Sequence, residues 1–238
     1  MKPEPTDAMI LAAGFGLRMR PLTNVTPKPL LKIDGITMID RMLAHLKEAK
    51  IKNVVINTHY MADKLSTHFR KETGFHIQLL QEEQLLDTGG AVANALPRLD
   101  GDSFIVSNSD VVIVSNKRPL ITRMIEAWNP KIMDALLLVQ PVTKAFGYSG
   151  QGDFHMDANG LLKREVTTSS ASSVFTGVQI LKRSLFHSLP TGPFSLNFLY
   201  DRAQQNGTLF GLVHDSHWMH VGTPEAIINA ETYLKNLK

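Results

Sequence analysis

The chain has 238 residues, of which 43% are hydrophobic and 20% charged, proportions typical of a globular protein long enough to bury a substantial core. It contains no cysteine, which excludes disulfides, thiolate metal sites and cysteine nucleophiles. A net charge of +3 without a long basic run, no apolar run of roughly 20 residues and no signal-peptide core predict a cytoplasmic protein that binds neither nucleic acid nor membrane.

Short apolar runs alternate with amphipathic stretches along the first half of the chain. The runs are typical of strands and the stretches between them of helices. The expected strands are residues 8–13, 54–57, 77–80, 104–107 and 135–139, and the expected helices are residues 38–49, 62–71, 90–96 and 119–128. This alternation predicts an α/β fold, a Rossmann-like and largely parallel sheet covered by helices on both faces. Ligands of such sheets bind at the carboxyl ends of the strands.

The pattern changes after about residue 140. Residues 154–156 and 161–166 flank an Asp-Ala-Asn-Gly turn and predict a β-hairpin, and residues 173–181 predict a further strand. Two helices follow, residues 194–205 and residues 224–237, the second with Thr223 as its N-cap. We expect one domain, 1–238, with a nucleotide-binding portion at 7–140 and a smaller antiparallel portion at 141–238.

The stretch from Leu11 to Leu30 carries the strongest chemical signal. It begins where the first predicted strand ends, and Gly14 and Gly16 let backbone amides approach a ligand. Arg18, Arg20 and Lys28 follow, among three prolines that stiffen the loop. Fixed positive charge beside exposed amides suits a polyphosphate.

The glycines alone are equally consistent with a plain βα turn whose basic flank is solvated. Met19 stands where a Rossmann fingerprint needs its third glycine, and no Gly-Lys-Ser/Thr of a Walker A loop is present. The whole string is similar to Leu-Ala-Ala-Gly-x-Gly-x-Arg-Met-x-Pro-Leu-Thr followed by Pro-Lys-Pro-Leu. The chain thereby resembles the sugar-1-phosphate nucleotidylyltransferases, whose fold is that of the nucleotide-diphospho-sugar transferases. The resemblance implies that Leu11, Ala12, Ala13, Gly14 and Gly16 bind nucleotide.

A second motif, Asp87-Thr88-Gly89-Gly90, lies where a strand turns into a helix. By itself it is a cap and a turn, with Thr88 as the capping residue. In the family that it resembles, this turn faces the nucleobase and ribose. The resemblance therefore implies that Thr88, Gly89 and Gly90 bind nucleotide, and that Gln81 and Glu82 occupy the position that reads the base edge.

A third motif places Asp110 just after an apolar strand. An aspartate there is a turn residue as often as a ligand. In similar proteins this carboxylate holds Mg²⁺, a hard cation that neutralises charge while pyrophosphate leaves.

His220 departs from the resemblance. It stands in Trp218-Met219-His220-Val221-Gly222-Thr223-Pro224, where the family has a second metal-binding aspartate. The expected cofactor is Mg²⁺. Because imidazole suits Mn²⁺ better than Mg²⁺, Mn²⁺ is an alternative. Two other interpretations stay open, a histidine behind the metal ligands and a weakened metal site.

The sugar side is less sharply defined. The resemblance implies that it is formed by Asn108, Gly152, Asp153, Glu165, Thr176, Gly177 and Asn197. A glutamate in a strand is more often solvated than sugar-binding, and Asn197 is equally consistent with a local polar contact. The portion at 141–238 is thus expected to bind the sugar phosphate.

The resemblance implies direct displacement on the α-phosphorus of an NTP by a sugar 1-phosphate, with Arg18, Lys28 and Asp110 as catalytic residues. The compact chain looks most like uridylyltransferases of N-acetylmuramate 1-phosphate, with guanylyltransferases of mannose 1-phosphate nearly as similar. A nucleotide-sugar-binding regulator without turnover is an alternative of another class. We expect a monomer or small homo-oligomer without the C-terminal β-helix domain of longer relatives.

Overall fold

The computed structural model describes residues 4–71, 73–115, 118–164 and 172–237. The helices are α1 (Met38–Glu48), α2 (Ala62–His68), α3 (Asp87–Ala95), α4 (Leu120–Ala127), α5 (Asn197–Gln205) and α6 (Pro224–Asn236). The strands are β1 (Asp7–Leu11), β2 (Lys32–Ile33), β3 (Ile36–Thr37), β4 (Asn53–Thr58), β5 (His76–Gln81), β6 (Ser103–Asn108), β7 (Val112–Ile113), β8 (Ala135–Pro141), β9 (Ala145–Phe146), β10 (Phe154–Met156), β11 (Leu162–Lys163), β12 (Ser172–Lys182), β13 (Leu209–Val213) and β14 (Trp218–Met219).

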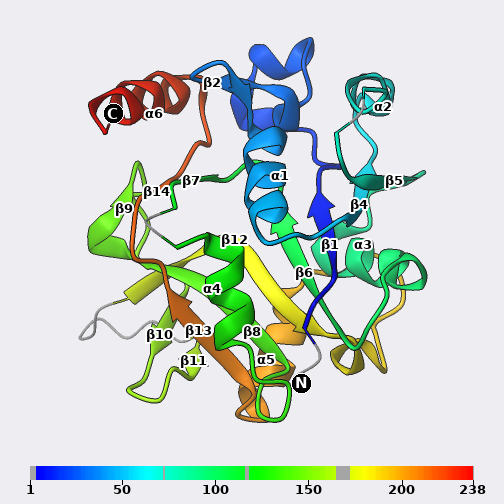
Figure 1. The fold of residues 1–238 in the computed structure, drawn as a ribbon, viewed down its shortest axis with the longest axis vertical. Helices are drawn as coiled ribbons and strands as arrows, with labels where there is room; N and C mark the ends of the chain where they lie inside the picture. Colours follow the sequence, from blue (N-terminus) through cyan, green and yellow to red (C-terminus); the bar gives the residue numbers. More distant parts are fainter. Residues whose placement is uncertain (1–3, 72, 116–117, 165–171, 238) are drawn as a thin grey trace.

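A mixed central sheet organises the molecule, in the order β11-β10-β12-β6-β1-β4-β5, with β8 joining β12 to β13 (Figure 1). The pairs β5–β4, β4–β1 and β1–β6 are parallel, as is β8–β13. The long strand β12 runs antiparallel to β6, β8 and β10. The predicted α/β fold with a largely parallel sheet and an antiparallel portion is therefore confirmed.

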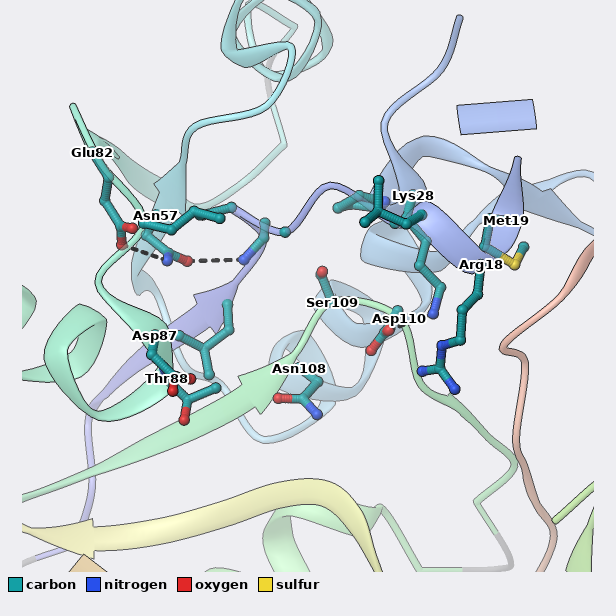
Figure 2. A pocket seen from close by; sticks show the side chains of 18 of the residues that line it. Arg18, Met19, Lys28, Asn57, Glu82, Asp87, Thr88, Asn108, Ser109 and Asp110 are labelled. Carbon is teal, nitrogen blue, oxygen red and sulfur yellow. Dashed lines mark hydrogen bonds and ion pairs between the residues drawn. The ribbon is translucent and has the colours of Figure 1, made fainter. Parts of the chain in front are cut away.

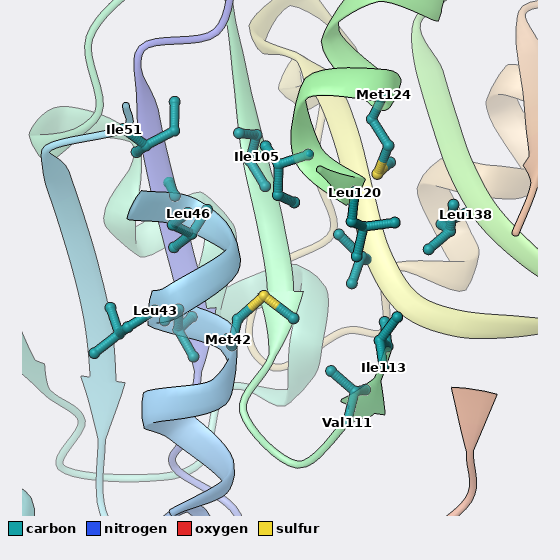
Figure 3. Packing of buried hydrophobic residues seen from close by; sticks show 14 of the residues in the cluster. Met42, Leu43, Leu46, Ile51, Ile105, Val111, Ile113, Leu120, Met124 and Leu138 are labelled. Atoms are coloured by element: carbon teal, nitrogen blue, oxygen red, sulfur yellow. The ribbon is translucent and has the colours of Figure 1, made fainter. Parts of the chain in front are cut away.

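Helices bury both faces of the parallel strands. Along β1, Ala8 and Ile10 belong to one apolar cluster and Met9 to another, because successive side chains of a strand point to opposite faces. The first cluster is covered by α1 and α4, with Met42 and Leu46 packed toward the sheet (Figure 3). These two lie four positions apart, on one face of α1. Each fully buried side chain of this kind contributes about 1.5–3 kcal/mol.

The second cluster lies on the opposite face, under α3 and α5. A third cluster, away from the central sheet, joins the Leu11-to-Leu30 segment to the end of the chain. Met19 is fully buried there, together with Val221 and with Ala230 and Leu234 of α6. The basic loop thus rests on an apolar base built partly by the last helix.

Several boundaries differ from the sequence-based expectation. The helix expected at 194–205 begins at Asn197, because the backbone of Phe194 instead bonds to Leu86, Gly89 and Gly90. The expected helix at 62–71 ends at His68. Thr223 is confirmed as the N-cap of α6, its hydroxyl accepting from the Ala226 amide.

Thr88, by contrast, does not cap α3. The helix begins at Asp87, and the Thr88 hydroxyl accepts a hydrogen bond of 2.9 Å from the amide of Leu196. The threonine therefore fastens the start of α3 to the segment before α5.

Candidate active site

A cavity of about 720 Å³ opens beyond the carboxyl ends of β1, β4 and β6. It is lined by Leu11, Ala12, Ala13, Gly14, Gly16, Leu17, Arg18, Met19, Lys28, Pro29, Asn57, Glu82, Leu85, Asp87, Thr88, Asn108, Ser109, Asp110, Pro193 and Gly222. The position is the one that a parallel sheet favours for ligands. Most of the residues predicted to bind nucleotide, and all three predicted catalytic residues, meet in this one space.

The glycine loop forms one wall. Gly16 has φ +63°, and a Cβ there would lie 3.0 Å from Cγ2 of Thr23 and 3.1 Å from Cβ of Lys28. The Thr23 hydroxyl also donates to the Gly16 carbonyl, at 2.9 Å. Gly14 differs, since a Cβ there would meet no atom within 4 Å. Gly16 suits the left-handed backbone and close packing of the loop, whereas Gly14 leaves the cavity open beside the backbone.

Two cations and a carboxylate gather on the same side (Figure 2). The Lys28 ammonium lies 2.6 Å from Oδ2 of Asp110, and its side chain is only 13% exposed. Arg18 follows the glycine loop and is exposed. Cations that line a partly closed space favour phosphate oxygens, because fixed charge is screened less there than in open water.

On the other side, Asn57 connects the ends of three strands. Its Oδ1 accepts from the amide of Ala12 at 2.8 Å, and its Nδ2 donates to Oε1 of Glu82 at 2.7 Å (Figure 2). Asn57 and Glu82 are 3% and 4% exposed. Asn57 was not among the predicted site residues. The signal that could have identified it is a polar residue directly after Val54, Val55 and Ile56 in a strand expected to be buried.

Asp87 and Thr88 line the cavity, but Gly89 and Gly90 lie behind it. A Cβ on Gly89 would be 2.4 Å from Cε2 of Phe194, and the amides of both glycines donate to the Phe194 carbonyl. In the described structure these two glycines serve close packing against Phe194. Gln81 is exposed and lines a separate hollow with Glu83, Gln84 and Asn94.

His220 is close to Gly222 but is not among the residues that line the main cavity; it lines a smaller one with Phe146, Gly147 and Thr223. A Cβ on Gly222 would be 2.8 Å from Nε2 of His220 and 3.6 Å from a guanidinium nitrogen of Arg18. Burial lowers the pKa of His220, and the charges of Arg18 and Lys28 lower it further against the opposing effect of Asp110. The imidazole is therefore neutral at neutral pH.

The predicted sugar residues separate into groups. Asn108 lines the main cavity, and Gly177 packs against it, where a Cβ would lie 3.0 Å from Nδ2 of Asn108. Thr176 is fully buried and donates to the Leu138 carbonyl. Glu165 lies outside the described residues.

A second cavity of about 360 Å³ contains the other predicted sugar residues. It is lined by Gly152, Asp153, Phe154, Arg164, Phe175, Asn197 and Tyr200. Its charged groups are already engaged by the protein. Oδ2 of Asp153 accepts from the Phe175 amide, and Arg164 pairs with Asp201 at 2.6 Å.

A divalent cation would find one carboxylate on the main cavity's cationic side, that of Asp110. Among the described residues, no group of three or more histidines, aspartates or glutamates is placed to hold a metal ion. The donors present therefore fit a cation that takes one oxygen from the protein and the remainder from a bound ligand and water, as Mg²⁺ commonly does.

No helix in the described part of the chain combines the length and apolarity needed to cross a membrane.

The nucleotidyl transferase family matches residues 7–236. The N-acetylmuramate alpha-1-phosphate uridylyltransferase of Caulobacter vibrioides is 36% identical, over 98% of this chain and 99% of the relative. The same enzyme of Neisseria meningitidis serogroup B is 30% identical, over 91% and 93%.

Two further matches are less similar in sequence, and one of them is a solved structure with the same fold. The mannose-1-phosphate guanylyltransferase of Mycobacterium tuberculosis is 26% identical, over 98% of this chain and 66% of its own. The crystal structure of HddC from Yersinia pseudotuberculosis complexed with GMP-PN superposes with a TM-score of 0.78 at 22% identity, covering 96% of this chain and 99% of that one. Because the family match covers nearly its whole length, the chain belongs to the nucleotidyl transferase family.

Proposed function

We propose that the protein transfers a uridylyl group from UTP to N-acetylmuramate 1-phosphate and releases pyrophosphate. The observation that carries the reaction type is the meeting of Arg18, Lys28 and Asp110 beside the glycine loop in a single cavity. Family membership supports the same reaction. The choice of substrates is supported by the 36% identity to a uridylyltransferase of that sugar phosphate over 98% of the chain.

A phosphate oxygen of the sugar 1-phosphate attacks the α-phosphorus of the NTP. A new P–O bond forms to that oxygen, and the bond to the β-phosphate oxygen breaks, so pyrophosphate leaves with its electron pair. The attacking oxygen is already an anion, and no general base is required. The barrier lies in bringing two anions together in line, which makes positioning and charge neutralisation the main contributions of the protein.

Groups of the protein can supply both the positioning and the charge neutralisation. The amides of the glycine loop and the guanidinium of Arg18 bind the triphosphate in this proposal. The ammonium of Lys28 exchanges its contact with Asp110 for oxygens of the α-phosphate and the sugar phosphate. A divalent cation, Mg²⁺ or Mn²⁺, held by Asp110 would add further charge neutralisation on phosphate oxygens. His220 is assigned a place behind these groups, because its Nε2 is directed toward Gly222.

The test is a substrate panel with purified protein. UTP, GTP, CTP and dTTP are each combined with N-acetylmuramate, mannose and glucose 1-phosphates, and pyrophosphate release is followed with Mg²⁺ and then Mn²⁺. We expect the highest kcat/KM for UTP with N-acetylmuramate 1-phosphate. A preference for GTP with mannose 1-phosphate would replace the substrate assignment, and nucleotide binding without pyrophosphate release under either metal would overturn the catalytic one.

We further propose that the protein acts in the cytoplasm as a monomer or small homo-oligomer.

A further inference from the structure

A buried chain of hydrogen bonds crosses the main cavity's inner wall, and the proposed chemistry does not use it. It runs from the Ala12 amide to Oδ1 of Asn57 (2.8 Å) and from Nδ2 of Asn57 to Oε1 of Glu82 (2.7 Å). It ends where the Leu86 amide donates to Oε2 of Glu82 (3.2 Å). Both side chains are nearly inaccessible to water, so each of these bonds is costly to leave unmade.

The direction of each bond is fixed by chemistry. The Ala12 amide can only donate, so the carboxamide oxygen of Asn57 must face it and the Asn57 amino group must face Glu82. The Leu86 amide can also only donate. Residue 82 therefore needs two acceptor oxygens, which a carboxylate has and a carboxamide lacks.

The two ends of this series of hydrogen bonds belong to different walls of the cavity. Ala12 leads from β1 into the glycine loop, and Leu86 immediately precedes α3, which begins with the cavity residues Asp87 and Thr88. The backbone of residue 82 is held as well, since the Glu82 amide donates to Thr58 and the Glu82 carbonyl accepts from the ring of His59. The separation of the two walls thus depends on two buried side chains.

We infer that Asn57 and Glu82 are positioning residues that set the gap between the phosphate-binding loop and the wall at residues 85–88, and with it the affinity and base selectivity for the nucleotide. This inference rests on the proposed function, with the nucleotide reaching from the glycine loop to Thr88 as the family resemblance implies. It assigns the Glu82 carboxylate to the protein's own amides rather than to the base edge. It also gives a role to Asn57, which touches no predicted catalytic group.

The fixed directions allow a sharp test by exchanging the two functional groups. In Glu82→Gln, the carboxamide amino group at position 82 faces another donor, either the amino group of Asn57 or the amide of Leu86. In Asn57→Asp, the carboxylates at positions 57 and 82 face each other. The double variant N57D/E82Q restores every bond. Its carboxylate at position 57 accepts from the Ala12 amide with one oxygen and from the carboxamide amino group at position 82 with the other. The carboxamide oxygen at position 82 then accepts from the Leu86 amide, and the total charge is the same as in the wild type.

The matched control is Asn53→Asp. Asn53 lies on the same strand, β4, and its Nδ2 also donates to a carboxylate, that of Asp7 at 3.0 Å, away from the residues that line the cavity. Its replacement removes the same kind of bond at a site without nucleotide. For each variant we would measure KM for UTP and for the sugar phosphate, kcat, the preference for UTP over GTP, and the melting temperature.

We expect E82Q and N57D each to raise KM for UTP by about tenfold or more, the effect of one buried donor or acceptor left unpaired. KM for the sugar phosphate should change little, and base preference should weaken. N57D/E82Q should recover both KM and preference, whereas N53D should lower only the melting temperature. Wild-type KM in E82Q, or a double variant no better than the single ones, would overturn the inference.

If a single variant fails to fold, the double variant still decides, because it has a full set of partners: recovery supports the inference and failure overturns it. If the wild type turns over no substrate pair, the proposed function fails by itself. Dissociation constants for UTP and GTP from titration calorimetry then compare the same variants without relying on activity.

Discussion

The ammonium of Lys28 and the carboxylate of Asp110 form an ion pair at 2.6 Å, although 82 positions separate the two residues along the chain. Lys28 lies in the turn Lys28–Leu30, and Asp110 follows the end of β6. Each group has a proposed ligand of its own, phosphate for the lysine and a cation for the aspartate. In the proposed mechanism, the pair keeps both charges compensated until substrates replace the contact.

Removal of the lysine should abolish most turnover without unfolding the protein. We expect Lys28→Ala to lower kcat about 100- to 1000-fold, the usual cost of one fixed donor to developing charge. Asp110 remains hydrated, since its side chain is 34% exposed, so the melting temperature should change little. The control is Lys32→Ala, an exposed lysine of β2 that does not line the cavity. Steady-state kinetics and thermal unfolding measure the two effects, and a Lys28→Ala rate close to that of Lys32→Ala would refute the assignment.

Metal dependence tests the position of His220. Nε2 of His220 is directed toward Gly222, so His220→Ala should change the Mg²⁺ concentration for half-maximal activity only a little. We expect a shift of less than about tenfold, because tenfold is the lower limit of the effect usually seen when a residue that supports the metal ligands is lost. His220→Asp should likewise stay within that range, because position 220 is not among the residues that line the main cavity beside Asp110. Metal titrations of activity decide the matter. A strong loss of Mn²⁺ activation in His220→Ala would show that the imidazole is a ligand after all.

Stability should fall in mild acid because of His214. Burial lowers the pKa of this histidine from 6.5 to about 4, partly opposed by its hydrogen bond with the His217 carbonyl and by Asp215. The unfolded chain therefore binds this proton at higher pH than the folded one, and the free energy of unfolding decreases as pH falls from about 6.5 to 4. At about 1.4 kcal/mol per pKa unit, the loss approaches about 3 kcal/mol.

Urea unfolding at pH 7.5 and pH 4.5 measures this loss. His214→Gln should lose less stability between the two pH values than the wild type does, since it cannot titrate there. His187→Gln, at an exposed position, should keep the wild-type difference. Equal pH dependence in wild type and His214→Gln would exclude the buried imidazole as its source.

Two glycines should respond to alanine in opposite ways. Gly89→Ala places a methyl group 2.4 Å from a ring carbon of Phe194, so we expect a loss of about 1–3 kcal/mol in the free energy of unfolding. Gly14→Ala meets no protein atom within 4 Å and should change stability by less than about 0.5 kcal/mol. Its methyl group enters the cavity instead, and KM for the nucleotide should rise. A stable Gly89→Ala protein would contradict the packing role.

Much of this arrangement could be predicted from the sequence. Apolar runs indicated the strands of the parallel sheet from local composition alone. The string of glycines, cations and prolines after β1 identified the cavity wall through its resemblance to the family motif, because the glycines alone fit a plain turn equally well. The roles of Thr88, Gly89 and Gly90 depended on Phe194 and Leu196, about a hundred positions away. No local pattern contains such a contact.

Asn57 shows the same limit from another side. Its place at the end of β4 follows from the sequence, but its two partners lie on neighbouring strand ends and become visible only when the sheet is assembled. Glu82 likewise resembles a surface residue among Gln81, Glu83 and Gln84, whereas the fold buries its carboxylate.

The apolar base under the glycine loop has a consequence for how the protein becomes functional. Met19 and the residues Ala230 and Leu234 of α6 share one core, so the loop that carries Arg18 and Lys28 gains its support from residues translated more than two hundred positions later. Leu31, Ile33, Met38 and Val112 belong to the same core and are made earlier, but the glycine loop lacks the part of its support that α6 supplies until that helix docks. Completion of the glycine loop's support therefore waits for the synthesis of α6.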